Sequence, residues 1–452
     1  MDQTYALCAI ALWTLYRILP AVLRRLKGPH VVAVRQNAAL VAVNALLYPS
    51  CLLVDLLGFE VPKIGYMLRR PLSLKALMKK AERRTGLTDW DADERGFPTL
   101  YEATCEELNA TPASPIGRLI AFDYLMRRLM TRLKVVQAAK ARKPRPDLVK
   151  EPLFVIGLPR TGTTFLHRLL ALDPAARYPE THELLDPLPA KDRSLAKRVR
   201  YWDKKLQLIK TLVPQIEAIH ELGAREAEEC LLALSVEVPL LPPTFRHLVR
   251  YSVQKGVPDL ARAYALYRRQ LEFLAEADGD ANKRWTLKCP AHVPFLADLA
   301  TSFPDAKVVW THRDPKASLP SLGSMFRTFA DMCESGPVDL AAIGREQLAF
   351  WSLAADRADA TLAAKNAPPC AHVKYADLIK DPVAVVTSIY ASFGWTVSPA
   401  FKAAMVDYLA KNAEKRGKNK RLAKFHRYSL EEYGLDAGEV DARFSRYATA
   451  HL

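Results

Sequence analysis

The stretch EPLFVIGLPRTGTTFLHRLLALDP, residues 151–174, decides the fold class of this protein. Its apolar run LFVI, residues 153–156, is typical of a buried β-strand, and the segment TTFLHRLLAL that follows has the spacing of a helix. Between them, Gly157 and Gly162 let the backbone turn so that its N–H groups converge on one point, next to the positive end of the helix. This order predicts a phosphate-binding loop, although a glycine turn before a helix also arises by coincidence.

The loop departs from the nucleotide-hydrolase pattern GxxxxGK(S/T) at one position. Thr163 stands where that pattern has its lysine, and Arg160 lies inside the loop. In nucleotide hydrolases the lysine reaches the β- and γ-phosphates, so its absence argues against chemistry on a triphosphate. Thr163 and Thr164 can cap the helix and donate hydroxyl groups to phosphate oxygens. The loop therefore suits a phosphate donor other than a nucleoside triphosphate.

The composition describes a globular, basic protein. The chain has 452 residues with 50% hydrophobic content, which is enough for one large domain or two ordinary ones. Lys and Arg number 65 against 49 Asp and Glu, so the surface should attract anions such as nucleotides, acidic lipids or nucleic acid. The seven cysteines form no CxxC pair and no Cys/His spacing typical of zinc, which favours reduced thiols in a protein that faces the cytosol.

The N-terminal region contains two apolar runs. Residues 5–16 are uncharged and are followed, not preceded, by basic residues, which is the reverse of a secretory signal. Residues 38–57 reach the length of about 20 that spans a bilayer, but Asn44, Pro49 and Asp55 interrupt the run. We expect residues 1–60 to associate with a membrane, helped by basic neighbours that suit anionic headgroups. Buried amphipathic helices are the alternative.

The rest of the chain divides at a charged, proline-broken linker, residues 140–150. Helical patterning dominates before it, and four short strand candidates separated by long helical stretches follow it. Strands that alternate with helices predict an α/β fold, a parallel sheet like that of P-loop NTPases with helices on both faces. We therefore predict a membrane-associating segment (1–60), a helical region (61–145) and an α/β domain (146–452). The strand candidates are residues 153–156, 284–288, 307–312 and 372–375.

A second phosphate-binding constellation lies in KVVWTHRDPKASLPS, residues 307–321. A buried strand ends near Arg313, and Pro315 begins a helix that carries Ser321, eight residues after the arginine. An arginine at the carboxyl end of a strand and a nearby hydroxyl could hold one phosphate together. Alternatively, Arg313 could form a structural salt bridge at the point where the strand ends.

Together these segments resemble the sulfotransferases. GLPRTGTT is similar to their 5′-phosphosulfate loop, P(K/R)xGTT, and VVWTHRDPKASLPS to their 3′-phosphate motif, an arginine with a serine eight residues later. The closer resemblance is to the mostly bacterial sulfotransferases with a PRSGTT loop, and it covers about residues 151–447. This sequence departs from the usual motifs of that family at three places. It has EEYG in place of EDFG and Cys289 in place of serine, and it lacks the proline before EEC. Further matching segments are HELLDPLP (182–189), EEC (228–230), WTLKCPAH (285–292) and HRYSLEEYGL (426–435).

This resemblance implies 3′-phosphoadenosine 5′-phosphosulfate (PAPS) as the donor and transfer of a sulfuryl group to a hydroxyl or, less readily, an amine. Such a transfer leaves charge on a phosphate, so cations must lie beside it, and Arg160 and Lys288 are the candidates. We expect no metal, because these cations and the helix terminus meet the charge. The resemblance further implies a set of donor-binding residues: Arg160, Thr161, Gly162, Thr163, Thr164, Arg313, Ser321, Tyr375, Arg416, Lys418 and Arg427.

The base that removes the acceptor's proton remains open among three residues. His292 follows Lys288 by four positions, similar to a Lys-x-His segment of cytosolic sulfotransferases. Glu183 lies shortly after the loop helix, where tyrosylprotein sulfotransferases have their catalytic glutamate. His220 precedes the EEC segment. The alternative for each of the three is a structural ion pair or a capped helix end.

The acceptor is expected to be a lipophilic alcohol or lipid, because of the apolar N-terminal runs. An ATP-dependent kinase with the same loop, or a non-catalytic membrane-associated nucleotide-binding protein, are the alternative functions. Nucleic acid is excluded as a partner, because the basic run at residues 411–427 lacks interleaved aromatics and a recognition module.

Overall fold

The structure is a computed structural model that describes residues 71–92, 97–189, 194–212, 216, 220–240, 242–278, 283–335, 337–418 and 428–452. The predicted membrane-associating segment, residues 1–60, lies outside these ranges, and so does Arg427. Among the helices that are described, none is both long enough and apolar enough to span a membrane.

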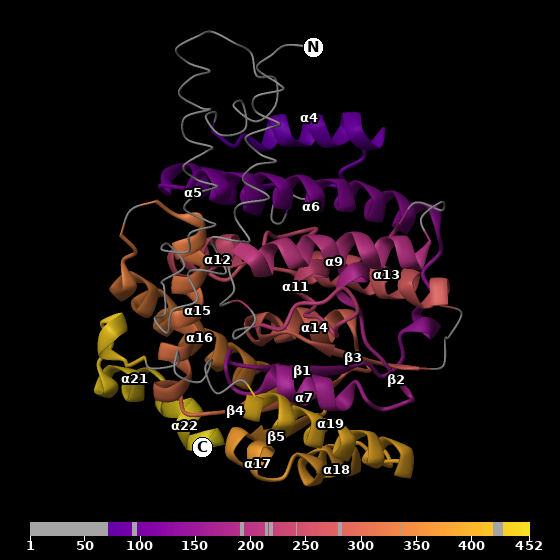
Figure 1. The fold of residues 1–452 in the computed structure, drawn as a ribbon, viewed down its shortest axis with the longest axis vertical. Coiled ribbons are helices and arrows are strands. Elements are labelled where there is room, and N and C mark those ends of the chain that lie inside the picture. Colours follow the sequence, from indigo (N-terminus) through magenta and orange to yellow (C-terminus); the bar gives the residue numbers. More distant parts are fainter. Residues whose placement is uncertain are drawn as a thin grey trace.

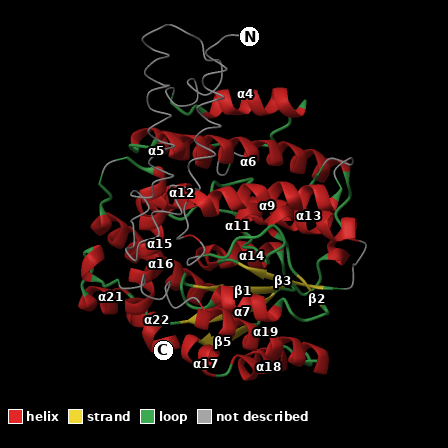
Figure 2. Cartoon of the chain, viewed as in Figure 1, coloured by secondary structure: helices red, strands yellow, loops and turns green. Residues whose placement is uncertain are grey.

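A five-stranded parallel sheet with the order β2-β3-β1-β4-β5 forms the centre of the fold, as Figures 1 and 2 show. Val155 of the central strand pairs with Lys288 on one side and with Val309 on the other, so these strands end at the same edge. The predicted α/β fold is confirmed. The strands are β1 (Leu153–Gly157), β2 (Ala176–Arg177), β3 (Arg284–Lys288), β4 (Lys307–His312) and β5 (Cys370–Lys374).

Two details of the strands differ from the sequence prediction. The strand β2 has only two residues, too few to give an apolar pattern. The last strand begins at Cys370, and Tyr375, predicted to end it, is the first residue of helix α17. Tyr375 therefore lies just beyond the carboxyl end of β5.

Both faces of the sheet are covered by helices, because alternate residues of the buried strands point to opposite sides. Leu153 and Val155 pack on the face that α7 and α17–α19 cover. Phe154 and Ile156 belong to the larger core on the other face. The helices of the first face are α7 (Thr163–Leu170), α17 (Tyr375–Lys380), α18 (Pro382–Ser392) and α19 (Pro399–Lys418).

The larger core is built from helices that come from several parts of the chain. On this side of the sheet Trp285 and Trp310 are almost fully buried. The helices of this side are η2 (Pro146–Leu148), α8 (Thr181–Leu185), α9 (Leu195–Leu212), α11 (Leu231–Leu234), α12 (Pro242–Lys255), α13 (Ala261–Asp278), η3 (Pro290–Phe295), α14 (Leu296–Ser302), α15 (Pro315–Cys333), α16 (Leu340–Leu362), η4 (Glu431–Tyr433), α21 (Ala437–Arg443) and α22 (Ser445–His451).

A further helical layer lies outside this core, at the top of Figure 1. It consists of α4 (Leu74–Thr85), α5 (Thr99–Ala110) and α6 (Pro115–Ala141), which share a hydrophobic cluster with Trp90 and Phe97. Helix α6 also packs against α13 and α15. The division between residues 145 and 146 into two domains stays a prediction.

Two buried arginines of α6 join this layer to the rest of the protein. Arg128 donates from Nη1 to the carbonyls of Leu184 and Leu232 (both 3.2 Å) and from Nη2 to Leu185 (2.8 Å). Arg132 forms a buried ion pair with Glu237. Since Leu184 and Leu185 end α8 and Leu232 lies in α11, Arg128 links α6 to both elements.

We predict that Arg128→Met lowers the free energy of unfolding by about 3 kcal/mol or more, since three buried carbonyls lose their donor. The neighbouring Arg127→Met is the matched control. Arg127 makes a half-exposed i,i+4 pair with Asp123, so its loss should cost about 1 kcal/mol or less. Chemical denaturation of both variants measures the difference, and equal losses would contradict the anchoring role of Arg128.

Candidate active site

The glycine loop packs tightly against β4. Gly157 has φ +153°, and a Cβ built there would lie 2.3 Å from Thr311 Oγ1 and 2.8 Å from Thr161 Oγ1. Thr161 is fully buried; its hydroxyl donates to the carbonyl of Leu158 (2.6 Å) and lies 2.6 Å from Thr311 Oγ1. The side chain of Thr161, one of the predicted donor-binding residues, is therefore used to hold the loop.

The loop then turns into α7 through two residues with positive φ. Arg160 has φ +69°, which is uncommon for a residue with a side chain, and Gly162 has φ +93° as the N-cap of α7. A Cβ on Gly162 would lie 3.0 Å from Tyr375 Cδ2, so the ring of Tyr375 packs directly against the turn. This conformation brings the side chain of Arg160 toward α15.

One side of the loop gathers four of the predicted donor-binding residues. Arg160 Nε donates to Ser321 Oγ (3.0 Å), and Arg313 Nη1 donates to the carbonyl of Arg160 (2.8 Å). The guanidinium of Arg313 lies 4.4 Å from the centre of the Tyr375 ring. Tyr428, to which the sequence gives no role, donates to Ser321 Oγ (2.8 Å). Two guanidinium groups and two hydroxyls thus meet at the carboxyl end of β4.

The other side of the loop gathers the predicted cation Lys288 and an acidic segment. Lys288 ends β3, is buried, and donates from Nζ to Thr164 Oγ1 (3.2 Å) and to Glu229 Oε1 (2.5 Å). The amide of Cys230 donates to the carbonyl of Lys288 (3.0 Å), which fixes the EEC segment beside the end of β3. Glu229 is therefore a site residue that the sequence analysis missed, although its segment had been singled out.

His220 lies next to this lysine and is paired with Glu228. Its Nε2 lies 3.0 and 3.1 Å from the two carboxylate oxygens, and its side chain remains 25% exposed. The charge of Glu228 raises the pKa of His220 above its ordinary value, although burial and Lys288 oppose the shift. Burial would raise the pKa of Glu228, but His220 and Lys288 lower it to about 2. The result is a partly exposed imidazole held by a carboxylate.

His292 and Glu183, the other two candidate bases, are in structural environments. His292 is fully buried in η3, with Nδ1 2.7 Å from the hydroxyl of Tyr264 and its ring edge-on to Phe154. Burial lowers its pKa to about 3. Both oxygens of Glu183 accept from Arg177 (2.7 and 2.8 Å), and Oε2 also accepts from an amide in a capping box. The geometry favours packing for the first and helix capping for the second.

For the remaining predicted donor-binding residues, the structure gives little geometry. Thr163 is buried at the start of α7. Arg416 and Lys418 lie in the last turns of α19. The structure does not describe their side chains or any part of Arg427. The role of this basic run in donor binding stays a prediction.

We predict that histidine-selective NMR will give His220 a pKa above 6.5 in the native protein, and a lower one in Glu228→Gln, because the carboxylate charge is the main cause of the shift. The ion pair should stabilise the fold fully between about pH 4.5 and 6.5, the ordinary values of the two groups. This stability should fall as pH rises through the raised pKa of His220, or as pH falls toward about 2 through that of Glu228. An unchanged pKa in Glu228→Gln would contradict the pairing.

Comparisons with known proteins identify the family and support the fold. The sequence profile of the sulfotransferase family matches residues 152–399, more than half of the chain. None of the proteins of curated function matches. Among solved structures, the sulfotransferase STF1 of Mycobacterium tuberculosis is 28% identical with a TM-score of 0.65, and the match covers 83% of this chain and 99% of that one. The sulfotransferase STF9 of Mycobacterium avium, 24% identical with a TM-score of 0.65 and coverage of 84% and 96%, shares the fold. The chain belongs to the sulfotransferase family.

Proposed function

We propose that the protein transfers a sulfuryl group from PAPS to a hydroxyl or, less readily, an amine of a lipophilic acceptor. One observation carries the proposal: two cationic clusters lie on the two sides of a single glycine loop. Thr164 and Lys288 form one cluster. Arg160, Arg313 and Ser321 form the other, although Arg160 was predicted to lie with Lys288 beside the phosphosulfate. A donor with one phosphosulfate and one separate phosphate requires two such clusters.

We assign the two ends of the donor to the two clusters from the charged and polar groups that each cluster offers. The phosphosulfate would lie at the start of α7, where backbone N–H groups and the helix dipole favour an anion and Lys288 supplies a full positive charge. The 3′-phosphate would lie beside Arg313 and Ser321, where a planar guanidinium can donate two hydrogen bonds. The missing lysine at Thr163 fits this donor, which has no γ-phosphate.

The chemical step is an in-line displacement at sulfur. The acceptor oxygen forms a bond to sulfur, the bond from sulfur to the 5′-phosphate oxygen breaks, and the electron pair remains on that phosphate. Lys288 stabilises the charge that develops there, while Glu229 and Thr164 hold its ammonium in place. The acceptor proton passes to His220, whose charged form Glu228 stabilises. We choose His220 over His292 because His220 is partly exposed.

The lipophilic acceptor rests on the sequence. The apolar runs at residues 5–16 and 38–57 precede the described part of the chain, and the net charge of +16 suits an anionic membrane surface. A membrane-associated enzyme that faces the cytosol would meet acceptors dissolved in the bilayer. The two alternative functions differ in their ligands: a kinase would bind ATP with magnesium, and a non-catalytic protein would bind the donor without turnover.

We predict that Arg313→Ala weakens binding of 3′-phosphoadenosine 5′-phosphate about ten- to a hundredfold, because a charge-assisted contact worth roughly 1.5–3 kcal/mol is lost. Binding of adenosine 5′-phosphate, which lacks the 3′-phosphate, should change little. The control is Arg327→Ala. Arg327 is an exposed residue of α15, the helix that follows Arg313, and it pairs with Asp331 and Glu432. Calorimetric titration of both nucleotides against the native protein and the two variants measures the six affinities. Equal weakening of both nucleotides, or tight magnesium-dependent binding of ATP, would overturn the donor assignment.

We predict that His220→Gln lowers kcat about 10²- to 10⁴-fold without changing donor affinity, because the general base is lost. The assay transfers label from radioactive PAPS to lipid and aqueous fractions of a cell extract, and label should enter the lipid fraction. In the native enzyme kcat/KM should fall as pH drops below the raised pKa of His220, and this limb should be absent from the variant.

His182→Gln is the control, because His182 makes a similar pair with Glu180 (2.8 Å), although its side chain is buried. If His182→Gln and His220→Gln lose the same activity, the loss reflects the local fold and His220 is not the base. Label found only in small polar products would contradict the lipophilic acceptor and leave the donor assignment intact.

A further inference from the structure

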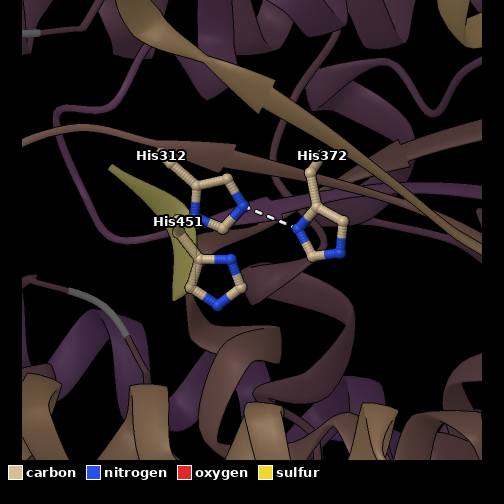
Figure 3. Close-up of side chains that lie close together, drawn as sticks. All are labelled: His312, His372 and His451. Carbon is tan, nitrogen blue, oxygen red and sulfur yellow. Dashed lines mark hydrogen bonds between the residues drawn. The ribbon is translucent and has the colours of Figure 1, made fainter. Parts of the chain in front are cut away.

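Three histidines from distant parts of the chain meet at the carboxyl ends of β4 and β5. His312 ends β4, His372 lies in β5, and His451 is the last residue of α22. Figure 3 shows ring nitrogens of all three turned toward a common gap, and one nitrogen of each lies within 4.8 Å of the others. Nothing in the proposed sulfuryl transfer uses these side chains.

The hydrogen bonds on the far sides of two rings orient them toward this gap. His451 Nε2 donates to Asp359 Oδ1 (2.7 Å), which leaves the lone pair of Nδ1 facing inward. His312 Nδ1 lies 3.2 Å from the hydroxyl of Tyr447, and in the tautomer that donates there its Nε2 presents a lone pair. A ring N–H held by a carboxylate or another oxygen is the usual support of a metal-binding histidine.

The third ring completes the set. His372 Nδ1 lies 2.8 Å from His312 Nε2, so one of these nitrogens donates to the other when the gap holds no ion. His372 is exposed, so its proton can move to Nε2 and be solvated there. Its exposure also gives an ion a path to the buried His312.

We propose that His312, His372 and His451 bind a divalent transition-metal cation of the zinc class through Nε2, Nδ1 and Nδ1, with water as a fourth ligand. Imidazole nitrogen is a preferred ligand of Zn²⁺, Ni²⁺, Co²⁺ and Cu²⁺, and not of Mg²⁺ or Ca²⁺. Zinc–nitrogen bonds of about 2.0–2.1 Å in a tetrahedron place ligand nitrogens about 3.3 Å apart. The present separations of 2.8 Å to at most 4.8 Å require shifts of about an ångström. The three ring planes lie within 8–19° of parallel, so the rings must also rotate for their lone pairs to converge on one ion.

The charges around the cluster permit a cation. Asp359 supplies a negative charge beside His451. Lys374 opposes a cation, but its ammonium donates to the terminal carbonyl of Leu452 (2.6 Å).

The location assigns the ion a structural role. It would join β4, β5 and the C-terminal helix α22. Its ligand His312 directly precedes Arg313 in the chain. The sequence predicts no metal site, because these histidines are far apart along the chain and have no recognisable spacing. The inference is independent of the proposed sulfuryl transfer, which does not involve this ion.

The test uses the full chain without a histidine tag, freed of metal by a chelator and dialysis. Titration with Zn²⁺ alone should show one equivalent bound, and titration with Co²⁺ alone should give the intense visible absorption of a four-coordinate nitrogen site. An excess of Mg²⁺ should not compete. His372→Ala and His451→Ala should each weaken Zn²⁺ binding at least tenfold. Both residues are partly exposed, so their variants should fold, whereas His312 is too buried for this purpose.

Thr449→Ala, an exposed change in the same helix, is the matched control and should bind as the native protein does. Zn²⁺ should also raise the Tm of the native protein and not that of the double variant His372→Ala/His451→Ala. If the native protein binds no Zn²⁺, or binds it as tightly as the double variant, the cluster is only a packed group of rings and the proposal is wrong.

Discussion

The close approach of the glycine loop to β4 is the constraint on which the rest of the site depends. Gly157 has no room for a Cβ, because the hydroxyls of Thr311 and Thr161 fill that space and bond each other. This contact holds the end of β1 against the end of β4. Since Arg313 follows Thr311 by two residues, the same contact brings its guanidinium to the carbonyl of Arg160. Two segments more than 150 residues apart are thereby held together at the proposed anion site.

A second constraint is the buried ammonium of Lys288, which must have a partner inside the protein. Glu229 supplies it, and the backbone bond from Cys230 to Lys288 keeps that carboxylate in reach. The arrangement explains how the site stays folded without a donor: the positive charge that the donor needs is already balanced. It also brings Glu228 and His220 to the same strand end, because Glu228 precedes Glu229 directly.

The sequence was sufficient for the fold and for naming four residues that lie together beside the glycine loop, whose donor-binding role stays a prediction. It failed where tertiary contacts decide. Apolar strands and a glycine loop have local patterns, so β1, β3 and β4 could be predicted. The surroundings of the candidate bases could not, because closeness to Lys288 in sequence suggested His292, and η3 turns that ring into the core against Phe154. The identity of the base stays a prediction. His372 and His451 gave no signal at all, since only the folded sheet and α22 bring them together.

The outer helical layer and the active site are more closely connected than the sequence suggests. Arg128 of α6 binds the carbonyls that end α8, and α8 in turn pairs with the segment before Glu228 through the amides of Thr181 and His182. Arg128 also binds Leu232, two residues after Cys230. The acidic segment that holds Lys288 is therefore braced on both sides by one buried guanidinium. Because that brace comes from α6, the helical layer positions the acidic segment beside the glycine loop as well as covering the core.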